Sequence, residues 1–316
     1  MSIASFFKLV EIQTKVASVI PLSLGTIYAV YHFHHFNLKN FIFMLVSLLT
    51  FDMATTAINN YIDYKKAIKK EGYGYELHNA IVRDNLSEFS VLLAIFILVG
   101  IALISGIFLF LNTNVVILLL GAISFFVGIC YSFGPIPISR MPLGEIFSGL
   151  FMGFVIPFIS IYIHVFNQEI LTLILRGHVL TFHIDIVEVF YIFLVSLPAV
   201  IGIANIMFAN NICDMEEDIQ NARYTLPIYI GKDLSLKLFA FSYAFLYLDI
   251  ILLVVLKVES ILSLIVLITA LPVRKNIQTF LKRQDKKDTF ILAVKNFILI
   301  NFIRVITLIV ASIINL

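Results

Sequence analysis

Long apolar runs constrain this chain more than any other feature of its sequence. They lie at about residues 17–36, 40–62, 89–111, 115–133, 145–166, 189–212, 235–256, 260–280 and 289–315. A helix needs roughly 20 mostly apolar residues to cross the hydrocarbon core of a bilayer. Continuously apolar helices satisfy their own backbone groups in lipid, whereas barrel strands would give short alternating segments. The sequence therefore predicts an all-α polytopic membrane protein with nine transmembrane helices.

The composition agrees with this class and excludes others. Hydrophobic residues make up 60% of the 316 residues and charged residues 13%, against about 25% charged in soluble domains. The net charge of +2 is too small to indicate a nucleic-acid partner, and two cysteines give no disulfide framework. No Gly/Ser-rich linker interrupts the chain, so we expect one membrane domain over residues 1–316.

The distribution of Lys and Arg predicts the orientation. With a cytoplasmic N-terminus, 18 of the 22 Lys and Arg residues fall in inside segments, and only Lys39, Arg176 and Lys257 fall in outside loops. Cytoplasmic loops carry the excess of Lys and Arg in membrane proteins. The sequence thus predicts an integral protein of a cell membrane, most simply a bacterial one, with its C-terminus outside.

Two polar insertions follow the second and sixth spans, at residues 64–87 and 214–236, and each is preceded by the same pattern. Asn59 and Asp63 form one Asn-x-x-x-Asp sequence, and Asn210 and Asp214 form the other, which Asp218 extends. Residues four apart lie on one face of a helix. Mg²⁺ takes carboxylate and amide oxygens, keeps several waters and commonly bridges carboxylates to phosphates. The repeat predicts a Mg²⁺ site for a phosphorylated substrate.

These acidic patterns have two other interpretations, solvated helix ends and a transporter. Either pattern alone is typical of a solvated helix end, but two on one membrane side favour a ligand. A transporter would place carboxylates near the midplane, whereas these lie at the interface. Basic residues predicted in the same layer would bind the phosphates, and they are Lys65, Lys66, Arg83, Arg140, Arg223 and Lys232.

These residues resemble the UbiA superfamily of intramembrane aromatic prenyltransferases. The segment NNICDMEEDIQNARYTLPIYIG resembles that family's second acidic motif, and NNYIDYKKA followed by IVRD resembles its first. YSFGPIPISRMPLGE is similar to a segment of the 1,4-dihydroxy-2-naphthoate branch, as is TKVASVIPLSLGTIYA in the first span. The resemblance covers nearly the whole chain.

The resemblance implies a nine-helix bundle around a central cavity and Mg²⁺-dependent transfer of a polyprenyl group from its diphosphate to an aromatic acceptor. In the naphthoate branch carbon dioxide then leaves the ring. The acceptors 4-hydroxybenzoate, haem B and glycerol phosphate, used by other branches, remain alternatives. Five residues carry over as ligands of the Mg²⁺–diphosphate: Asn59, Asp63, Asn210, Asp214 and Asp218. Arg83 would assist them, and Tyr131 would face the developing allylic cation.

The chain departs from the family pattern in places. Ala67 stands where a third acid often occurs in the first motif, and Glu71 or Glu76 could compensate. Glu11 and Gln13 stand in the first helix where relatives often have basic residues. Gly72 and Gly74 suggest that the loop 64–87 closes over bound substrate.

Three charged residues fall inside predicted spans. Asp52 lies 11 positions before Asp63, which places it about 16 Å deeper on nearly the same helix face. It is a candidate for positioning or deprotonating an acceptor hydroxyl, or for a structural hydrogen bond at the level of Thr55 or Thr56. Asp249 and Arg304 share one depth, so we expect them to pair, with snorkelling of Arg304 as the alternative.

Overall fold

The computed structural model describes residues 1–66, 79–132 and 137–315. Two compact units emerge from the packing of the chain. The first comprises Met1–Val19 and Ile42–Pro137, and the second comprises Ile20–Phe41 and Ile138–Leu316. Helices α2 (Val16–Phe33) and α3 (Leu38–Lys66) run through both. The single domain expected over residues 1–316 stays a prediction, and each unit is described by itself.

The first unit is built from helices that pack around the part of α3 from Ile42 onward. Besides parts of α2 and α3 it contains α1 (Ile3–Leu9), η1 (Ile12–Lys15), α5 (Ala80–Arg83), α6 (Glu88–Leu111) and α7 (Val115–Ser132). Leu9, Ala54, Ile81 and Val91 are fully or almost fully buried in its core. Small Ala54 on α3 lets neighbouring side chains pack close to the helix backbone.

The limits of α6 follow from its sequence. The Ser87 hydroxyl accepts a hydrogen bond from the Ser90 N–H at 3.3 Å, and Glu88 follows in the first turn, where its charge suits the helix dipole. An apolar run then continues until Asn112 caps the last turn. Further along the chain, Gly128 of α7 lies against the Phe51 ring of α3, where a Cβ would come within 2.7 Å. Glycine therefore permits the close approach of these two helices.

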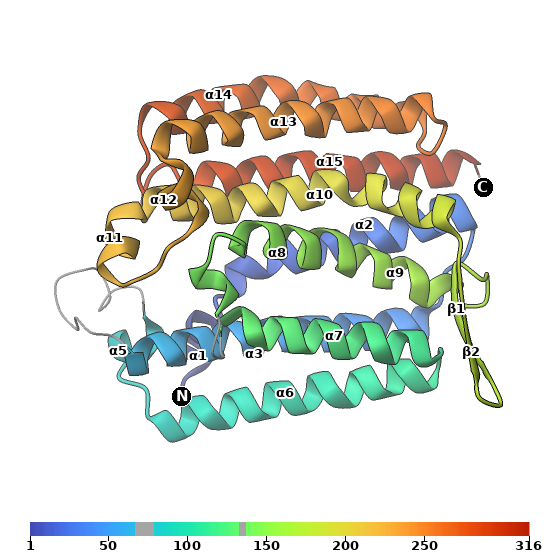
Figure 1. The fold of residues 1–316 in the computed structure, drawn as a ribbon, viewed down its shortest axis with the longest axis horizontal. Helices are drawn as coiled ribbons and strands as arrows, with labels where there is room; N and C mark the ends of the chain where they lie inside the picture. The colour runs from blue at the N-terminus through green and yellow to red at the C-terminus, as the bar shows by residue number, and fades with distance from the viewer. Residues whose placement is uncertain (67–78, 133–136, 316) are drawn as a thin grey trace. The chain divides into compact units, whose positions relative to one another are not determined.

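The second unit contains most of the remaining helices (Figure 1). They are η2 (Ile138–Arg140), α8 (Gly144–Leu150), a π-helical segment (Phe151–Val155), α9 (Ile156–Val165), α10 (Ile186–Cys213), α11 (Met215–Gln220), α12 (Leu226–Ile230), α13 (Lys232–Val255), η4 (Ile261–Thr269), α14 (Ala270–Lys282) and α15 (Ile291–Asn315). Helix α10 lies at the centre and packs against α8, α13 and α15.

Glycine permits the closest of these contacts. A Cβ on Gly153 would lie 2.4 Å from the Val200 Cα of α10, and one on Gly149 would lie 2.9 Å from the Val200 carbonyl oxygen. The backbones of the π-helical segment and α10 are therefore almost in contact. Pro157 follows within the first two residues of α9, where the missing N–H costs least. This packing fixes α10, which carries the second acidic motif at its end.

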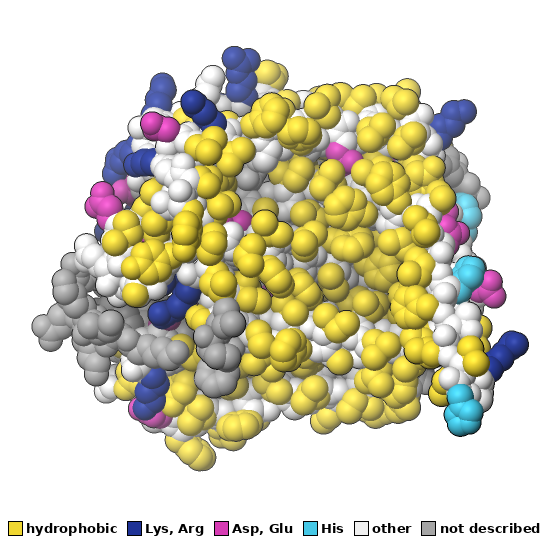
Figure 2. Space-filling view, in the orientation of Figure 1, with side chains coloured by type: hydrophobic (Ala, Val, Ile, Leu, Met, Phe, Trp, Pro, Cys, Tyr) yellow, Lys and Arg dark blue, Asp and Glu magenta, His cyan; other side chains and the backbone are white. Residues whose placement is uncertain are grey.

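The membrane character of the chain is confirmed. Eight helices of the described residues are long and apolar enough to cross a bilayer, and the apolar helix Val115–Tyr131 is slightly shorter. These nine segments coincide with the nine predicted spans, so the predicted count is close. In the second unit, Figure 2 shows hydrophobic side chains over the middle of α13 and α14, with Lys and Arg near the end where α13 begins. Phe241, Leu248 and Leu271 are 60–75% exposed on these helices, as lipid-facing residues are.

One element was missed by the sequence analysis. Strands β1 (Leu171–Arg176) and β2 (Val179–Ile184) form an antiparallel hairpin in the segment between α9 and α10, which we had assigned to an outer loop. Gly177, with φ +60°, occupies the two-residue turn where a left-handed backbone is required. The fold is therefore helical with one added hairpin.

The predicted pairing of Asp249 with Arg304 is wrong. Arg304 is fully buried on α15 and forms an ion pair with Glu259, and its Nη1 donates to the Val195 carbonyl oxygen at 2.6 Å. Among the described residues the Asp249 carboxyl group has no hydrogen-bond partner. The sequence did not indicate Glu259 as the partner of Arg304, because Glu259 lies just beyond the seventh apolar run, where a charged residue is ordinarily solvated. Arg304 does not snorkel to the surface.

Candidate active site

The second acidic motif lies where α10 passes into α11, within the second unit. The Asp214 N–H donates to the Asn210 carbonyl oxygen at 3.0 Å, and the Asp218 N–H donates to the Asp214 carbonyl oxygen at 2.8 Å. The four-residue spacing therefore persists through the junction between the two helices. Asp214 is 6% exposed and Asp218 3% exposed, which is unusual for carboxylates at a helix end. This burial favours a site over a solvated terminus.

Basic side chains neutralise both acids. Lys286, from the connection between α14 and α15, forms an ion pair with Asp214, and the Asn210 amide donates to the same carboxylate at 3.3 Å. Arg223 Nε lies 3.3 Å from Asp218 Oδ1. Burial raises the pKa of Asp218, while the Arg223 guanidinium opposes that shift and the Asp214 charge adds to it. Each acid of the motif thus has its own counter-ion.

The predicted phosphate-binding residues Arg140 and Arg223 come from neighbouring segments. The Tyr224 N–H donates to the Arg140 carbonyl oxygen at 3.1 Å, and Arg223 Nη2 donates to the Ser139 carbonyl oxygen at 3.4 Å. Thr225 is fully buried, and its hydroxyl donates to Asp218 at 3.3 Å. The segments 138–140 and 223–225 are therefore held against the second motif.

A buried acid that the sequence analysis did not select lies beside this motif. Glu145 is 4% exposed at the start of α8 and accepts a hydrogen bond from the Asn211 amide at 2.8 Å. Asn211 directly follows Asn210 on α10. The LGE sequence that contains Glu145 was noted as a family resemblance only, although a carboxylate at the start of an apolar span was itself a signal.

The first acidic motif lies on the last turns of α3 in the first unit. Asn60, between the two predicted ligands, donates to the Leu9 carbonyl oxygen at 2.9 Å, and its own carbonyl oxygen accepts from the Asn79 amide at 2.8 Å. These bonds attach the end of α3 to the N-terminal helix and to the start of α5. Asn59 is half-buried and Asp63 is exposed. This arrangement orients the motif and leaves the Asp63 side chain accessible.

Two of the predicted basic residues near this motif have acidic partners. Lys65 Nζ lies 2.6 Å from Glu88 Oε1, and Arg83 Nε lies 3.1 Å from Asp84 Oδ1. Hydrogen bonding from the Ser5 hydroxyl, with help from Arg83, lowers the pKa of Asp84. The substrate-binding roles of Lys65 and Arg83 stay predictions.

Both carboxylate oxygens of Asp52 have hydrogen-bond partners. Lys15 is 4% exposed, and its Nζ lies 2.6 Å from Asp52 Oδ1, 3.2 Å from the Asp52 carbonyl oxygen and 2.7 Å from the Thr56 hydroxyl. The Ser18 hydroxyl donates to the other carboxylate oxygen of Asp52. The alternative of a structural hydrogen bond at the Thr56 level therefore describes its contacts. Lys15 was counted only toward orientation and was missed as the partner.

Some predicted features fall at or beyond the limits of the described residues. Tyr131 is half-buried in the last turn of α7, next to the gap at 133–136. Ala67, Glu71 and Glu76, with the Gly72 and Gly74 hinges, lie outside the described residues. The closure of the loop 64–87 stays a prediction.

Whether these residues suit Mg²⁺ can be judged from the second motif. In the described part of the chain no three His, Cys, Asp or Glu side chains form a metal cluster of their own. Two buried carboxylates with an Asn amide beside them make an incomplete oxygen set. Mg²⁺ accepts such a set, because it keeps waters and takes its remaining ligands from phosphate. The residues fit a metal that arrives with a phosphorylated substrate, and the central cavity stays a prediction.

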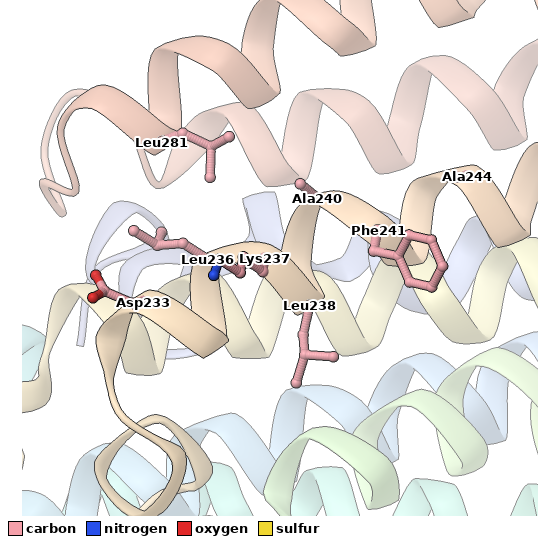
Figure 3. A pocket seen from close by; sticks show the side chains of 8 residues that line it. All are labelled: Asp233, Leu236, Lys237, Leu238, Ala240, Phe241, Ala244 and Leu281. Atoms are coloured by element: carbon pink, nitrogen blue, oxygen red, sulfur yellow. The ribbon is translucent and has the colours of Figure 1, made fainter.

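A surface groove in the second unit lies apart from this chemistry. It is lined by Asp233, Leu236, Lys237, Leu238, Ala240, Phe241, Ala244 and Leu281. Figure 3 shows these side chains on α13 and on the end of α14. None of the predicted site residues lines the groove, and its walls are mostly apolar, as expected for a helix face against lipid.

Comparison with known proteins identifies relatives of this chain. The family model described as the UbiA prenyltransferase family matches residues 18–301. A 1,4-dihydroxy-2-naphthoate octaprenyltransferase of Bacillus subtilis (strain 168) is 31% identical over 250 residues, which are 79% of this chain and 73% of that protein.

Solved structures agree in fold. A UbiA homologue from Archaeoglobus fulgidus bound to GPP and Mg²⁺ has a TM-score of 0.65 at 14% identity, over 98% of this chain and 99% of that one. The apo structure of a UbiA homologue from Aeropyrum pernix K1 has a TM-score of 0.63 at 16% identity, over 94% and 97%.

These matches define the class of protein, an integral membrane enzyme that transfers prenyl groups. The chain belongs to the UbiA prenyltransferase family. The resemblance to this family and the predicted fold class are thereby confirmed.

Proposed function

We propose that this enzyme transfers a polyprenyl group from polyprenyl diphosphate to 1,4-dihydroxy-2-naphthoate, with loss of carbon dioxide, to give a demethylmenaquinol-type product. The observation that carries the acceptor is the 31% identity with the B. subtilis protein of that activity over most of both chains. The paired acidic motifs at two helix ends support the diphosphate. We place the N-terminus and both motifs on the cytoplasmic side of a bacterial membrane, on the strength of the Lys and Arg distribution.

The second motif would hold the diphosphate head. Asp214, Asp218 and Asn210 would supply oxygen ligands for Mg²⁺, and Arg223 and Arg140 would contact phosphate oxygens. Bound there, Mg²⁺ would stabilise the negative charge that develops on the leaving diphosphate. We assign Asn59 and Asp63 the same role, with Lys65 and Arg83 as phosphate contacts, because the first motif repeats the second in sequence.

The acceptor chemistry follows from the allylic carbon. As the bond from that carbon to the diphosphate oxygen breaks, a ring carbon of the electron-rich acceptor attacks it, and the ring then loses its carboxyl group as carbon dioxide. In this proposal the Tyr131 ring would stabilise the cation through its π face. Asp52 would position the acceptor hydroxyl rather than deprotonate it, since Lys15 and Ser18 hold its carboxylate.

The test supplies purified protein with Mg²⁺, a labelled polyprenyl diphosphate and three aromatic or lipid acceptors in parallel: 1,4-dihydroxy-2-naphthoate, 4-hydroxybenzoate and a glycerol phosphate lipid. We expect a labelled quinol from the naphthoate alone, and none from the Asp214→Asn protein. Haem B forms a fourth arm. A product from any other acceptor at a higher kcat/KM would reassign the substrate within the family.

A further inference from the structure

The counter-ion of Asp214 comes from a distant part of the chain. Lys286 lies 72 residues further on, in the connection between α14 and α15, and forms its ion pair with a carboxylate that is 6% exposed. The Lys286 side chain is itself 48% exposed. A side chain on the surface therefore reaches inward to neutralise a buried acid. The sequence analysis had assigned Lys286 only to the basic residues that set orientation.

Hydrogen bonds hold the backbone around Lys286 in place. Asp285 Oδ1 accepts hydrogen bonds from the N–H groups of Lys287 at 2.9 Å and Asp288 at 3.0 Å, and the Asp285 N–H donates to the Thr289 hydroxyl at 2.8 Å. A lysine ammonium is a compact charge on a flexible four-carbon stem. Lys286 can therefore exchange one nearby anion for another without rearrangement of the loop.

The charges of the motif and its basic partners balance. Asp214 faces Lys286, and Asp218 faces Arg223, so two carboxylates meet two cations. A divalent cation gains little from a site that is already neutral, and it is repelled by the ammonium group on its own ligand. Metal binding becomes favourable once that ammonium moves onto an incoming anion. A diphosphate supplies such an anion.

We propose that Lys286 is a displaceable counter-ion and a diphosphate-binding residue. It neutralises Asp214 before the substrate binds, yields the carboxylate to Mg²⁺ and then binds an oxygen of the prenyl diphosphate. This inference rests on the proposed function, because it takes Asp214 as a metal ligand. It goes beyond that proposal in one respect. Binding of the metal favours binding of the diphosphate, and Lys286 contributes part of this positive coupling.

The experiment measures two affinities of the purified, detergent-solubilised protein. Mn²⁺ binding without diphosphate is followed by electron paramagnetic resonance, and binding of a prenyl thiodiphosphate is followed by calorimetry at saturating Mg²⁺. For Lys286→Met we expect about fivefold or greater tightening of Mn²⁺, within the range of measured couplings, and weaker binding of the thiodiphosphate. Lys286→Arg keeps the charge and is expected to behave more like the wild type in both measurements.

The matched controls separate this inference from the proposed function. Lys287→Met removes a neighbouring charge that is also exposed, and we expect it to change neither affinity by more than about twofold. Asp214→Asn should lose Mn²⁺ binding. If Asp214→Asn binds Mn²⁺ as the wild type does, the metal site of the proposed function is wrong. If Asp214→Asn loses the metal but Lys286→Met weakens both affinities, or matches Lys287→Met, the displacement by Lys286 is wrong and the metal site stands.

Discussion

Lys15 and Asp52 form an ion pair with a 2.6 Å separation that joins the end of η1, directly before α2, to the middle of α3 in the first unit. Lys15 is 4% exposed and uses its ammonium group on the Asp52 carboxylate, the Asp52 carbonyl oxygen and the Thr56 hydroxyl. The pair anchors the helix that carries Asn59 and Asp63 two to three turns further on. Asp52, a candidate catalytic residue in the sequence, thus has a structural partner in Lys15.

Removal of one partner is expected to cost more than removal of both. Lys15→Met leaves the Asp52 carboxylate without its counter-ion, and losing one member of a buried pair costs about 3–5 kcal/mol. Lys15→Met with Asp52→Leu should recover much of that loss, because no charge is left unpaired. Unfolding in detergent at increasing denaturant measures the difference. Equal losses in the single and double variants would contradict a pair of this kind.

The buried pair of Arg304 and Glu259 gives a second stability prediction. Arg304→Met should destabilise the protein by about 3–5 kcal/mol, and Arg304→Met with Glu259→Gln by clearly less. Asp249→Asn serves as the control at a similar depth, and it should change stability little, because Arg304 is satisfied by Glu259 and Val195. If Asp249→Asn lost as much stability as Glu259→Gln, Asp249 would be the partner of Arg304, as the sequence suggested.

Gly153 provides a test of the packing that fixes α10. Gly153→Ala puts a Cβ 2.4 Å from the Val200 Cα, so the two backbones must separate, at an expected cost of about 1–3 kcal/mol or more. Gly100 on α6 has no atom within 4 Å of the same position, so Gly100→Ala should instead stabilise the helix by about 0.5 kcal/mol. Melting temperatures of the two variants should therefore shift in opposite directions. A neutral Gly153→Ala would mean that the two segments are not in close contact.

The connection that presents Lys286 should depend on pH. Hydrogen bonds from the backbone N–H groups of Asp288 and Lys287 lower the pKa of Asp285. A lowered folded-state pKa means that the charged form stabilises the loop above the ordinary pKa, and that this stability is lost as pH falls through the lowered value. Hydrogen exchange at the amides of Lys287 and Asp288, corrected for the intrinsic rate, should therefore rise in acid.

The matching variants are Asp285→Ala and Asp285→Asn. The first removes the acceptor and should expose both amides at neutral pH, whereas the second keeps an acceptor oxygen and should retain part of the protection. Protection that is equal in Asp285→Ala and in the wild type would show that other contacts hold the loop.

The sequence predicted local properties of this protein well. The apolar runs identified the spans because membrane insertion depends on the composition of about 20 consecutive residues. The spacing of Asn210, Asp214 and Asp218 predicted a shared helix face, since that depends only on helical geometry. The hairpin at 171–184 could also have been predicted, because Gly177 separates two runs of alternating character. The segment was instead interpreted only as an outer loop between two spans.

The partners of the charged residues could not be predicted in this way. Lys286 is 72 residues from Asp214, Glu259 is 45 from Arg304, and Lys15 is 37 from Asp52. Each pair depends on which helices pack together and at what depth, and hydropathy does not carry that information. Equal depth alone suggested Asp249 for Arg304, and the packing of α15 against η4 favours Glu259 instead.

Release of carbon dioxide from the acceptor tests the central claim most directly. Purified enzyme is given Mg²⁺, a polyprenyl diphosphate and 1,4-dihydroxy-2-naphthoate labelled in its carboxyl carbon, and labelled carbon dioxide and free diphosphate are counted together. The proposed reaction predicts one carbon dioxide for each diphosphate released, and neither product in the Asp214→Asn enzyme. Diphosphate released without labelled carbon dioxide, or faster turnover of an acceptor that has no carboxyl group to lose, would contradict it.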